Sequence, residues 1–355
     1  MKRILYLTNI EVPYRVRFFN ELAKYCDLTV VYERRRSKNR DAAWSSSESG
    51  RFRTEYLDGI HIHNESSFSL RILKYITGRY DAIIVGCYNS PVQAMAILVM
   101  RLLRIKYIVN VDGEVFVSGS DIKSKLKCLF LKGAAVYMAA GEKAAESLRA
   151  IADSAPVFPY YFSSLSKEEL LLHRQEHSNT HRNDTVLVVG QYFDYKGMDV
   201  ALSAAKMDSG IRYKLVGMGK RTELFKEHYR TEDIPNVELI PFLQKEKLEQ
   251  EYKKCAMLVL PSRQECWGLV INEAASFGVP IVSTWGSGAA VEFLADAYPQ
   301  YLAKPNDPED LLRCIRALKS SENKAVYCEY LLNKAALYSI EHSVQKHLAA
   351  CGIRV

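Results

Sequence analysis

Short apolar runs alternate along the chain with amphipathic stretches of helix length. In the first half, the runs of strand length cover residues 4–8, 28–32, 82–87 and 107–111. Between the first two, the stretch 13–24 opens with Pro13 and places Val16, Phe19 and Leu22 on one face, which is typical of an amphipathic helix. Strands that alternate with helices predict a parallel sheet covered by helices on both faces.

The alternation stops and then restarts. Residues 163–183 are polar, and after them strand-like runs return at 186–189, 214–216, 237–240 and 257–260. We therefore predict an α/β chain with a first domain over 1–162, a polar linker over 163–183, a second domain over 184–335, and a C-terminal helix within 336–355 that can return to the first domain. Two such domains facing one another predict a ligand cleft beyond the carboxyl ends of their strands.

Composition is that of a globular protein with two ordinary cores. The 355 residues are 48% hydrophobic and 25% charged. The longest apolar run, 94–100, is far shorter than the ~20 residues that cross a bilayer. The start MKRILYLTNI lacks a cleavage site and predicts a strand rather than a signal peptide. Eight scattered cysteines without a CxxC pair are typical of reduced thiols and indicate a cytoplasmic location.

Positive charge is concentrated in the first half. Residues 1–160 hold 24 Lys/Arg against 16 Asp/Glu, a net charge of +8, whereas 161–355 hold 24 against 25. Seven basic residues gather within 34–53, namely Arg34, Arg35, Arg36, Lys38, Arg40, Arg51 and Arg53. Such a segment suits an anionic membrane surface or an acidic acceptor, and a solvated loop is an equal alternative. Nucleic acid is disfavoured because no reading motif accompanies the charge.

Two carboxylates, Glu265 and Glu273, flank the start of a predicted helix in the second half. Gly268 begins that helix and lets a ligand approach the backbone closely. The first N–H groups of a helix favour a phosphate or a hydroxyl oxygen, and an acid within it can accept hydrogen bonds from paired hydroxyls. Taken alone, the two acids are better explained without a ligand, one as an N-terminal acid that favours the helix dipole and the other as a solvated acid.

The surrounding residues supply a specific pattern. The segment resembles the E-x7-E signature of retaining GT-B glycosyltransferases of family GT4, carried here by Pro261, Ser262, Glu265, Trp267, Gly268, Glu273, Ala274, Gly278 and Pro280. Upstream, VLVVGQYFDYKGMDVAL is similar to the family's phosphate loop, and YKLVGMGK to its next strand. PYRVRFFNELAKYCDLTVVYE looks like members that build surface polysaccharides and lipopolysaccharide.

The resemblance implies two Rossmann-like domains and a retaining, metal-independent transferase of the hexosyltransferase type. Its donor would be a UDP- or GDP-sugar, with no further cofactor. Glu273 would hold the ribose, Glu265 the transferred sugar, and Lys196 the leaving diphosphate. The full set of expected donor-binding residues is Gly190, Gln191, Lys196, Gly217, Cys266, Trp267, Gly268, Leu269, Val270 and Glu273.

The chain departs from the family at two places. Gln191 stands where many relatives have an arginine, so Lys196 is expected to carry more of the phosphate charge. Many relatives have a histidine in the first domain, whereas Asp112 and Glu114 follow a predicted strand here. These acids are expected to orient the acceptor hydroxyls, with Asp112 in the catalytic set, or else to be solvated turn residues.

Three residues after the first strand complete the expected acceptor site. The positions after this strand, where a dinucleotide-binding chain has its glycine-rich fingerprint, hold Tyr14, Arg15 and Arg17. The absence of the fingerprint makes the alternative function, a nicotinamide-dependent oxidoreductase, less favoured. The two arginines could pair with the diphosphate of a lipid-linked acceptor, although surface arginines are common. The remaining alternative is a catalytically inactive protein that binds nucleotide sugars or serves as a scaffold.

A histidine series lies in the predicted linker. His173, His177 and His181 recur every four residues, a spacing that can gather a metal on one helix face. The segment lacks an adjacent acid with a clear role, so a metal site is the weaker hypothesis. The chain also has no DxD triplet, so no metal-bridged diphosphate is predicted.

Overall fold

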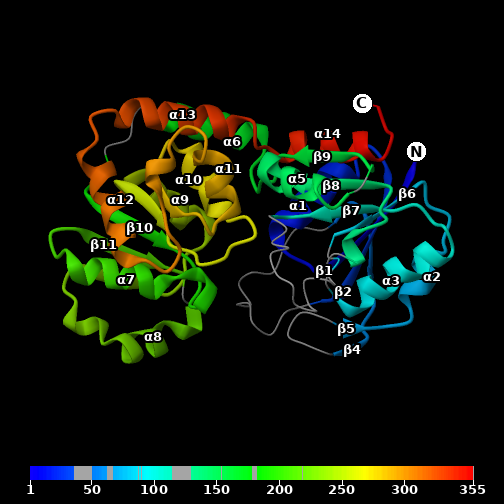
Figure 1. Cartoon of the computed structure of the whole chain (residues 1–355), viewed down its shortest axis with the longest axis horizontal. Helices are drawn as coiled ribbons and strands as arrows, with labels where there is room; N and C mark the ends of the chain where they lie inside the picture. Colours follow the sequence, from blue (N-terminus) through cyan, green and yellow to red (C-terminus); the bar gives the residue numbers. More distant parts are fainter. Residues whose placement is uncertain are drawn as a thin grey trace. The chain divides into compact units, whose positions relative to one another are not determined.

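The structure is a computed structural model that describes residues 1–35, 50–61, 67–86, 88, 90–113, 129–152, 154–177, 182–217 and 219–354. The chain forms two compact units. The first comprises Met1–Ser164 with Ile340–Val355, and the second Leu165–Ser339. Each unit is an α/β layer structure (Figure 1).

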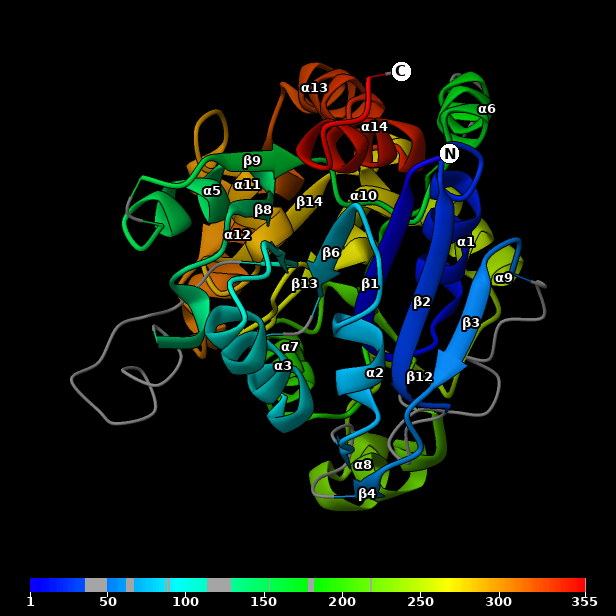
Figure 2. The ribbon, with the colours of Figure 1, turned by 90° about the vertical axis from the view of Figure 1, so that its right-hand side faces the viewer.

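A parallel sheet of seven strands forms the centre of the first unit, in the order β3-β2-β1-β6-β7-β8-β9. Strands added on one side of β1 and then, after a crossover, on its other side give the doubly wound arrangement. Figure 2 shows β1, β2 and β3 side by side. The strands are β1 (Arg3–Ile10), β2 (Asp27–Arg34), β3 (Arg53–Tyr56), β6 (Ala82–Val85), β7 (Ile108–Val111), β8 (Val136–Ala140) and β9 (Val157–Tyr160), with the antiparallel pair β4 (Ile60–His61) and β5 (Ser67–Phe68).

Helices cover this sheet on both faces. Helix α1 begins at Pro13 after an extended Val12, and α3 begins at Pro91, where Ser90 Oγ accepts from Gln93 N at 3.3 Å. The C-terminal α14 packs against α1 and β9. The helices are α1 (Pro13–Leu22), α2 (Ile72–Ile76), α3 (Pro91–Leu102), α5 (Gly141–Arg149) and α14 (Ile340–Ala350).

The second unit repeats the design with a parallel sheet of six strands, in the order β12-β11-β10-β13-β14-β15. Its strands are β10 (Thr185–Val189), β11 (Arg212–Val216), β12 (Val237–Ile240), β13 (Met257–Leu260), β14 (Ile281–Thr284) and β15 (Leu302–Ala303). The helices are α6 (Lys167–His177), α7 (Met198–Met207), α8 (Thr222–Tyr229), α9 (Lys245–Lys254), α10 (Leu269–Ser276), α11 (Gly288–Leu294), α12 (Pro308–Ser320) and α13 (Lys324–Ala336). Short 3₁₀ turns lie at η2 (Asp194–Lys196), η3 (Gly219–Arg221), η4 (Thr231–Asp233) and η5 (Pro299–Tyr301).

The predicted fold class, two doubly wound Rossmann-like units, is confirmed. Residues 163–183 differ from the expected linker. They contain α6, which belongs to the second unit and packs against α10 and α13. Its mostly polar composition made this segment look like a linker in the sequence, where the contacts of α6 are not visible. Within the described ranges, no helix is both long and apolar enough to cross a membrane.

Candidate functional site

Two loops of the second unit meet where neighbouring parallel strands end. The loop after β10 and the loop after β13 leave the same edge of the sheet, because β10 and β13 pair in parallel. Gly197 has φ of 65°, and a Cβ on it would lie 2.1 Å from Pro261 O. Only a glycine fits this contact, so the two loops are pressed together at the switch point, where doubly wound sheets bind ligands.

Lys196 and Glu265 form an ion pair across these two loops. The Nζ atom of Lys196 contacts Oε2 of Glu265, and the two side chains are 20% and 14% exposed. The hydroxyl of Ser262 donates to the same carboxylate oxygen at 3.4 Å. Residues expected to act on the diphosphate and on the sugar are therefore adjacent, which their separation in the sequence did not reveal.

Glu265 is fixed by its own backbone as well. Its N–H donates to Gly286 O at 2.8 Å, and its carbonyl accepts from Gly288 N at 3.1 Å. A Cβ on Gly286 would lie 2.3 Å from Arg263 O, and one on Gly288 would lie 2.3 Å from Cys266 O. The two glycines allow the loop after β14 to run directly against the segment that carries Glu265, which holds its carboxylate in place.

Helix α10 begins beside this pair. Gly268 caps it with φ of 102° and no side-chain hydrogen bond, and the helix starts at Leu269. The N–H groups of its first turn, including Leu269 and Val270, are not used by the helix itself. Together with the dipole, they make this end suited to an anion. Cys266, in the preceding loop, is exposed.

The side chain of Trp267 packs in the second unit, and the expected donor contact of this residue is through its backbone N–H. It is 3% exposed, and its Nε1–H donates to Asn272 Oδ1 at 2.8 Å, so the indole belongs to the core. Any contact of Trp267 with a donor is left to its backbone.

Glu273 lies on α10 and is half-buried. Its Oε2 accepts a hydrogen bond from Tyr252 OH at 3.0 Å. Burial, followed by the charge of Glu273, raises the pKa of Tyr252 well above its usual value, so this phenol remains a donor. The carboxylate is thus oriented by a buried tyrosine.

Gly190, Gln191 and Gly217 lie at the ends of β10 and β11. Gly217 has φ of 108°, and a Cβ there would lie 3.1 Å from Gly190 O, so the two strand ends approach closely. Gln191 is half-buried on the same loop. The structure thus brings Gly190, Gln191, Lys196, Gly217 and Glu265 to the carboxyl ends of β10, β11 and β13, where α10 also begins.

Two arginines that sequence reasoning missed contact the loop after β10. Arg263 donates to Asp199 Oδ1 and Oδ2 at 2.9 and 2.6 Å and to Asp194 O at 2.5 Å. Arg221 lies 4.4 Å from the ring centre of Phe193 and donates to Tyr192 O at 2.8 Å. No local motif marks these contacts, because they join segments distant in the sequence. Two further cations, Arg221 from the turn η3 and Arg263 from the loop after β13, therefore contact the region that carries Lys196, and the charge of Arg263 is paired with Asp199.

Asp112 in the first unit lies within a buried polar network. It accepts from Arg15 Nη2, from Tyr160 OH at 2.6 Å and from Asn110 Nδ2 at 2.8 Å. Arg15 is only 6% exposed and also donates to Tyr6 OH at 3.0 Å. The interpretation of Arg15 as a surface residue is wrong, because its charge is used internally by Asp112. Asp112 is accordingly held rigid and is not a solvated turn acid.

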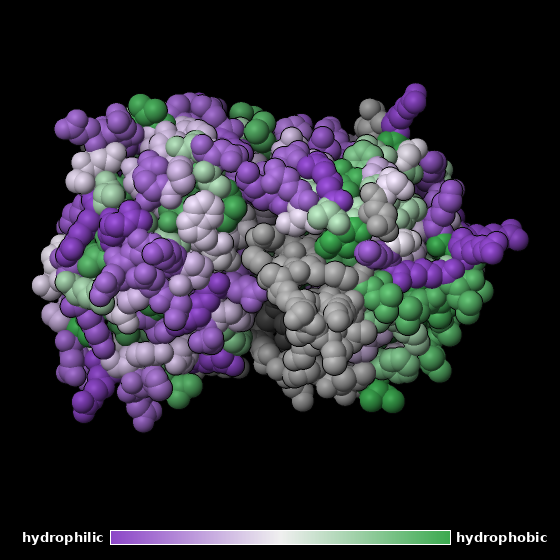
Figure 3. Space-filling model, in the orientation of Figure 1, coloured by the Kyte–Doolittle hydropathy of each residue, from purple (hydrophilic) through white to green (hydrophobic). Residues whose placement is uncertain are grey.

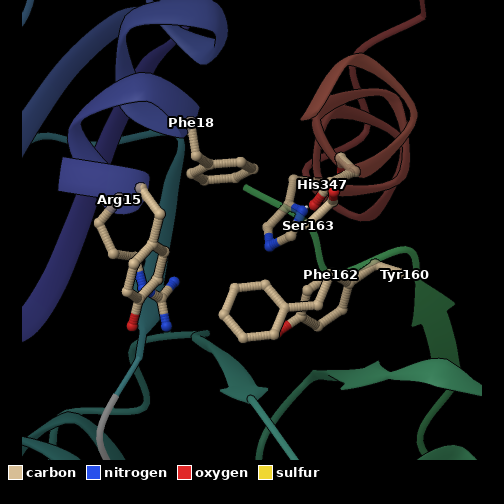
Figure 4. A pocket seen from close by; sticks show the side chains of 8 residues that line it. Arg15, Phe18, Tyr160, Phe162, Ser163 and His347 are labelled. Atoms are coloured by element: carbon tan, nitrogen blue, oxygen red, sulfur yellow. Dashed lines mark hydrogen bonds between the residues drawn. The ribbon is translucent and has the colours of Figure 1, made fainter. Parts of the chain in front are cut away.

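The C-terminal helix extends this network. His347 Nδ1 lies 2.7 Å from Ser343 O, and its Nε2 lies 2.9 Å from Asn110 Oδ1. Burial lowers its pKa to about 3. A small pocket lies here (Figure 4), lined by Tyr14, Arg15, Phe18, Tyr160, Phe162, Ser163, Ser343 and His347.

The remaining acceptor candidates are only partly placed. The ring of Tyr14 packs edge-on against Phe162 at 5.7 Å between centroids. Arg17 Nη1 donates to Ser164 O at 2.7 Å. Glu114 lies outside the described residues.

His173 and His177 pack against the end of α10. His173 stacks on Phe277 with centroids 3.8 Å apart and hydrogen-bonds Ser276 Oγ at 2.8 Å. Burial lowers the pKa of His173 to about 4. His177 Nδ1 lies 3.0 Å from Phe277 O, and His181 falls outside the described residues. Their spacing is explained by this packing, and no group of metal-ligating side chains was found in the part of the chain that the structure describes.

Four basic residues of the segment 34–53 are described, and one of them is buried. Arg34 is 6% exposed at the end of β2, and Arg35 lies 4.5 Å from the ring centre of Tyr56. Arg51 and Arg53 are exposed. Arg36, Lys38 and Arg40 are outside the described residues.

Comparisons with solved structures support the fold. The chain superimposes on sucrose-phosphate synthase from Thermosynechococcus elongatus with a TM-score of 0.69, 16% identity, and coverage of 98% of this chain and 97% of that one. For the UDP-glucose complex of HepE from Anabaena, the TM-score is 0.69 and the identity is 15%, with coverage of 99% of this chain and 100% of that one. For WaaG, a glycosyltransferase involved in lipopolysaccharide biosynthesis, the TM-score is 0.65 and the identity is 15%, with coverage of 99% of each chain. At this identity the likeness shows the GT-B fold.

The match to a family model falls within the second unit. Residues 172–331 match the family model described as glycosyl transferases group 1. An uncharacterized glycosyltransferase of Methanocaldococcus jannaschii is 31% identical over 136 residues, 38% of each chain. Another from Haemophilus influenzae is 29% identical over 169 residues, 46% of each. The aligned segments thus span less than half of these relatives. The second unit, which holds Lys196, Glu265 and Glu273, is thus similar over residues 172–331 to the glycosyl transferases of group 1.

Proposed function

We propose that the chain is a retaining glycosyltransferase that moves a hexosyl group from a nucleotide sugar to a glycan or lipid-linked acceptor. The observation that carries the proposal is the Lys196–Glu265 pair beside the free start of α10, within the segment that matches the family. A cation, a carboxylate and unused N–H groups at one strand edge are suited to a substrate with a diphosphate and a sugar.

Glu273 and Glu265 divide the donor between them. Glu273, oriented by Tyr252, accepts hydrogen bonds from the ribose hydroxyls, and Glu265 contacts the transferred sugar. The donor is a UDP- or GDP-sugar. A UDP-glucose complex is known for HepE, which shares the fold, and this agrees with a donor of that class.

Departure of the nucleoside diphosphate develops negative charge on its terminal phosphate. Lys196 and the N–H groups at the start of α10 stabilise that charge where it forms, which lowers the barrier to bond breaking. The acceptor hydroxyl attacks from the face that the diphosphate leaves, and the leaving phosphate takes the acceptor's proton. The configuration is retained without a protein nucleophile, and Lys196 does the work that a bridging metal does elsewhere.

The first unit binds the acceptor. Asp112, held by Arg15, Asn110 and Tyr160, orients an acceptor hydroxyl, and Tyr14, Arg17 and Glu114 contact the rest of the acceptor. Arg15 acts through Asp112, because it is buried. WaaG, of the same fold, acts in lipopolysaccharide biosynthesis, which favours an acceptor of the cell surface and a peripheral place at the membrane.

A screen of nucleotide sugars tests the proposal. A donor present at 100 times its dissociation constant stabilises the protein by about 2.7 kcal/mol, so the unfolding temperature rises for the true donor. Release of nucleoside diphosphate is then measured with glycan and lipid-linked acceptors. If no UDP- or GDP-sugar raises the unfolding temperature, the proposal is wrong. Binding without release in the presence of every acceptor class would favour the alternative, a catalytically inactive binder.

A further inference from the structure

Helix α3 of the first unit is apolar on two sides. One side packs into the core through fully buried residues that include Val92, Ala96 and Met100. On the other side, Leu98 and Leu102 are 47% and 82% exposed. Residues four apart share a face of a helix, so these leucines form an outward stripe where a surface helix ordinarily carries polar side chains.

The apolar surface continues past the end of α3. Leu103 is 53% exposed, and Leu129 is 51% exposed. Arg101 holds the segment of Leu129 beside α3, because its Nε donates to Tyr107 OH at 2.9 Å and its Nη2 to Phe130 O at 3.2 Å. Figure 3 shows hydrophobic residues gathered over α2 and α3. A contiguous apolar area of this kind marks an interaction site, unlike scattered single leucines.

The segment of the chain that carries α2 and α3 is basic, although the carboxylate of Glu55 on β3 accepts from Tyr75 OH on α2 at 3.0 Å. Between residues 67 and 111 the chain has six Lys/Arg and a single acid, Asp81. Four of the basic residues lie exposed on α2 or just beyond α3, namely Arg71, Lys74, Arg104 and Lys106. We call the exposed leucines on and after α3 and these four cations the α2–α3 face. Two copies of the chain pairing through it would oppose like charges, so a second copy is disfavoured and an anionic partner is favoured.

Arg104 has an unusual backbone conformation on this face. Its φ is 55°, in the left-handed region. The bonds from Ile105 N to Met100 O at 2.8 Å and from Arg104 N to Arg101 O at 3.1 Å close α3 in the motif whose left-handed position is normally glycine. An arginine here is strained, because the left-handed conformation disfavours a residue with a Cβ.

We propose that the α2–α3 face docks on the surface of an anionic lipid bilayer. The exposed leucines enter the interface between headgroups and acyl chains, and the four cations meet the lipid phosphates. Apolar area and positive charge together supply the two signals that stable attachment of a peripheral protein requires. This inference does not depend on glycosyl transfer or on the basic segment 34–53.

Sedimentation of the full chain with vesicles tests the proposal. We expect binding to vesicles of phosphatidylcholine with phosphatidylglycerol at low salt, weaker binding at high salt, and little binding to phosphatidylcholine alone. The double substitution Leu98→Ser and Leu102→Ser should weaken binding more than tenfold. Its matched control is Leu171→Ser with Leu172→Ser on α6, where the leucines are 65% and 52% exposed, and the control should bind like the wild type.

A second variant separates docking from folding. Arg104→Gly removes a cation but relieves the left-handed conformation, so the unfolding temperature should not fall, while vesicle binding weakens about fivefold, or about 1 kcal/mol. Arg230→Gly is the control, because Arg230 also has a left-handed φ, of 49°, at the end of a helix in the second unit. If the wild type ignores anionic vesicles at low salt, or if Arg104→Gly and the double leucine variant both bind like the controls, the proposal is overturned.

Discussion

Replacing Lys196 with Ala should separate catalysis from donor binding. Lys196 is the side chain paired with Glu265, and both are largely buried. Loss of one preorganised contact to the charge that develops in a transition state lowers turnover by about 100-fold or more, and two factors of ten correspond to about 2.7 kcal/mol. The donor in its ground state carries less of this charge, so we expect its dissociation constant to rise less than tenfold.

The same substitution affects stability. Breaking a fully buried ion pair costs about 3–5 kcal/mol, and an exposed pair is worth about 0.2–1 kcal/mol. With side chains 20% and 14% exposed, the Lys196–Glu265 pair lies between these limits, so Lys196→Ala should lower the free energy of unfolding by about 1–3 kcal/mol. Adding Glu265→Gln should recover part of that loss, because no uncompensated carboxylate then remains.

Three measurements check this reasoning, namely release of nucleoside diphosphate, donor affinity by calorimetry, and urea unfolding. Lys226→Ala is the matched control, because Lys226 pairs with Glu223 on the surface of the same unit, with side chains 38% and 82% exposed. It should leave all three quantities unchanged. A fall in turnover of less than about fivefold for Lys196→Ala would refute the role of Lys196 and direct attention to Arg221 and Arg263.

Three further predictions follow from the second unit and from the buried histidine. Glu273→Ala should weaken nucleotide binding by about 1.5–3 kcal/mol in calorimetry. Tyr252→Phe should weaken it less, because this change removes only the hydroxyl that orients Glu273. Unchanged affinity of the Glu273→Ala variant would reject the ribose contact. Arg263→Lys should keep the charge but lose the bidentate hydrogen bonds to Asp199. Amide hydrogen exchange of residues 194–199 should then become faster, and donor affinity should fall. Exchange at the wild-type rate would argue against a role of Arg263 in holding these residues. The pKa of His347 is lowered to about 3 in the folded state, so the unfolded state binds more protons below pH ~6.5. The free energy of unfolding should therefore fall by up to about 1.4 kcal/mol per pH unit as the pH drops below that value. In urea unfolding, His347→Gln should flatten this slope.

The sequence determined the fold class because its signals are local. Apolar runs of strand length alternate with amphipathic stretches, and this pattern predicts doubly wound sheets without any knowledge of long-range contacts. Gly197 and Gly268 likewise mark the loops of the site, and both have the left-handed conformation that favours glycine. The spacing of Glu265 and Glu273 on one helix start was also readable, since both lie within one short segment.

Only the tertiary structure decided which of these residues touch. Lys196 meets Glu265 because β10 and β13 are neighbours in the sheet, although they are far apart in the sequence. The same holds for Arg15, which looked like a surface residue and is buried against Asp112 by the adjacency of α1 and β7.

The polar stretch 163–183 shows the limit of composition. Its composition resembles that of a linker. In the structure, however, His173 stacks on Phe277, and α6 is part of the second unit. In the same way, the stripe of Leu98 and Leu102 is one of several apolar patterns in the sequence, and only the core packed on the opposite side of α3 shows that it faces outward. Periodicity gives the faces of each helix, whereas the order of the strands decides which face is covered and which charges meet.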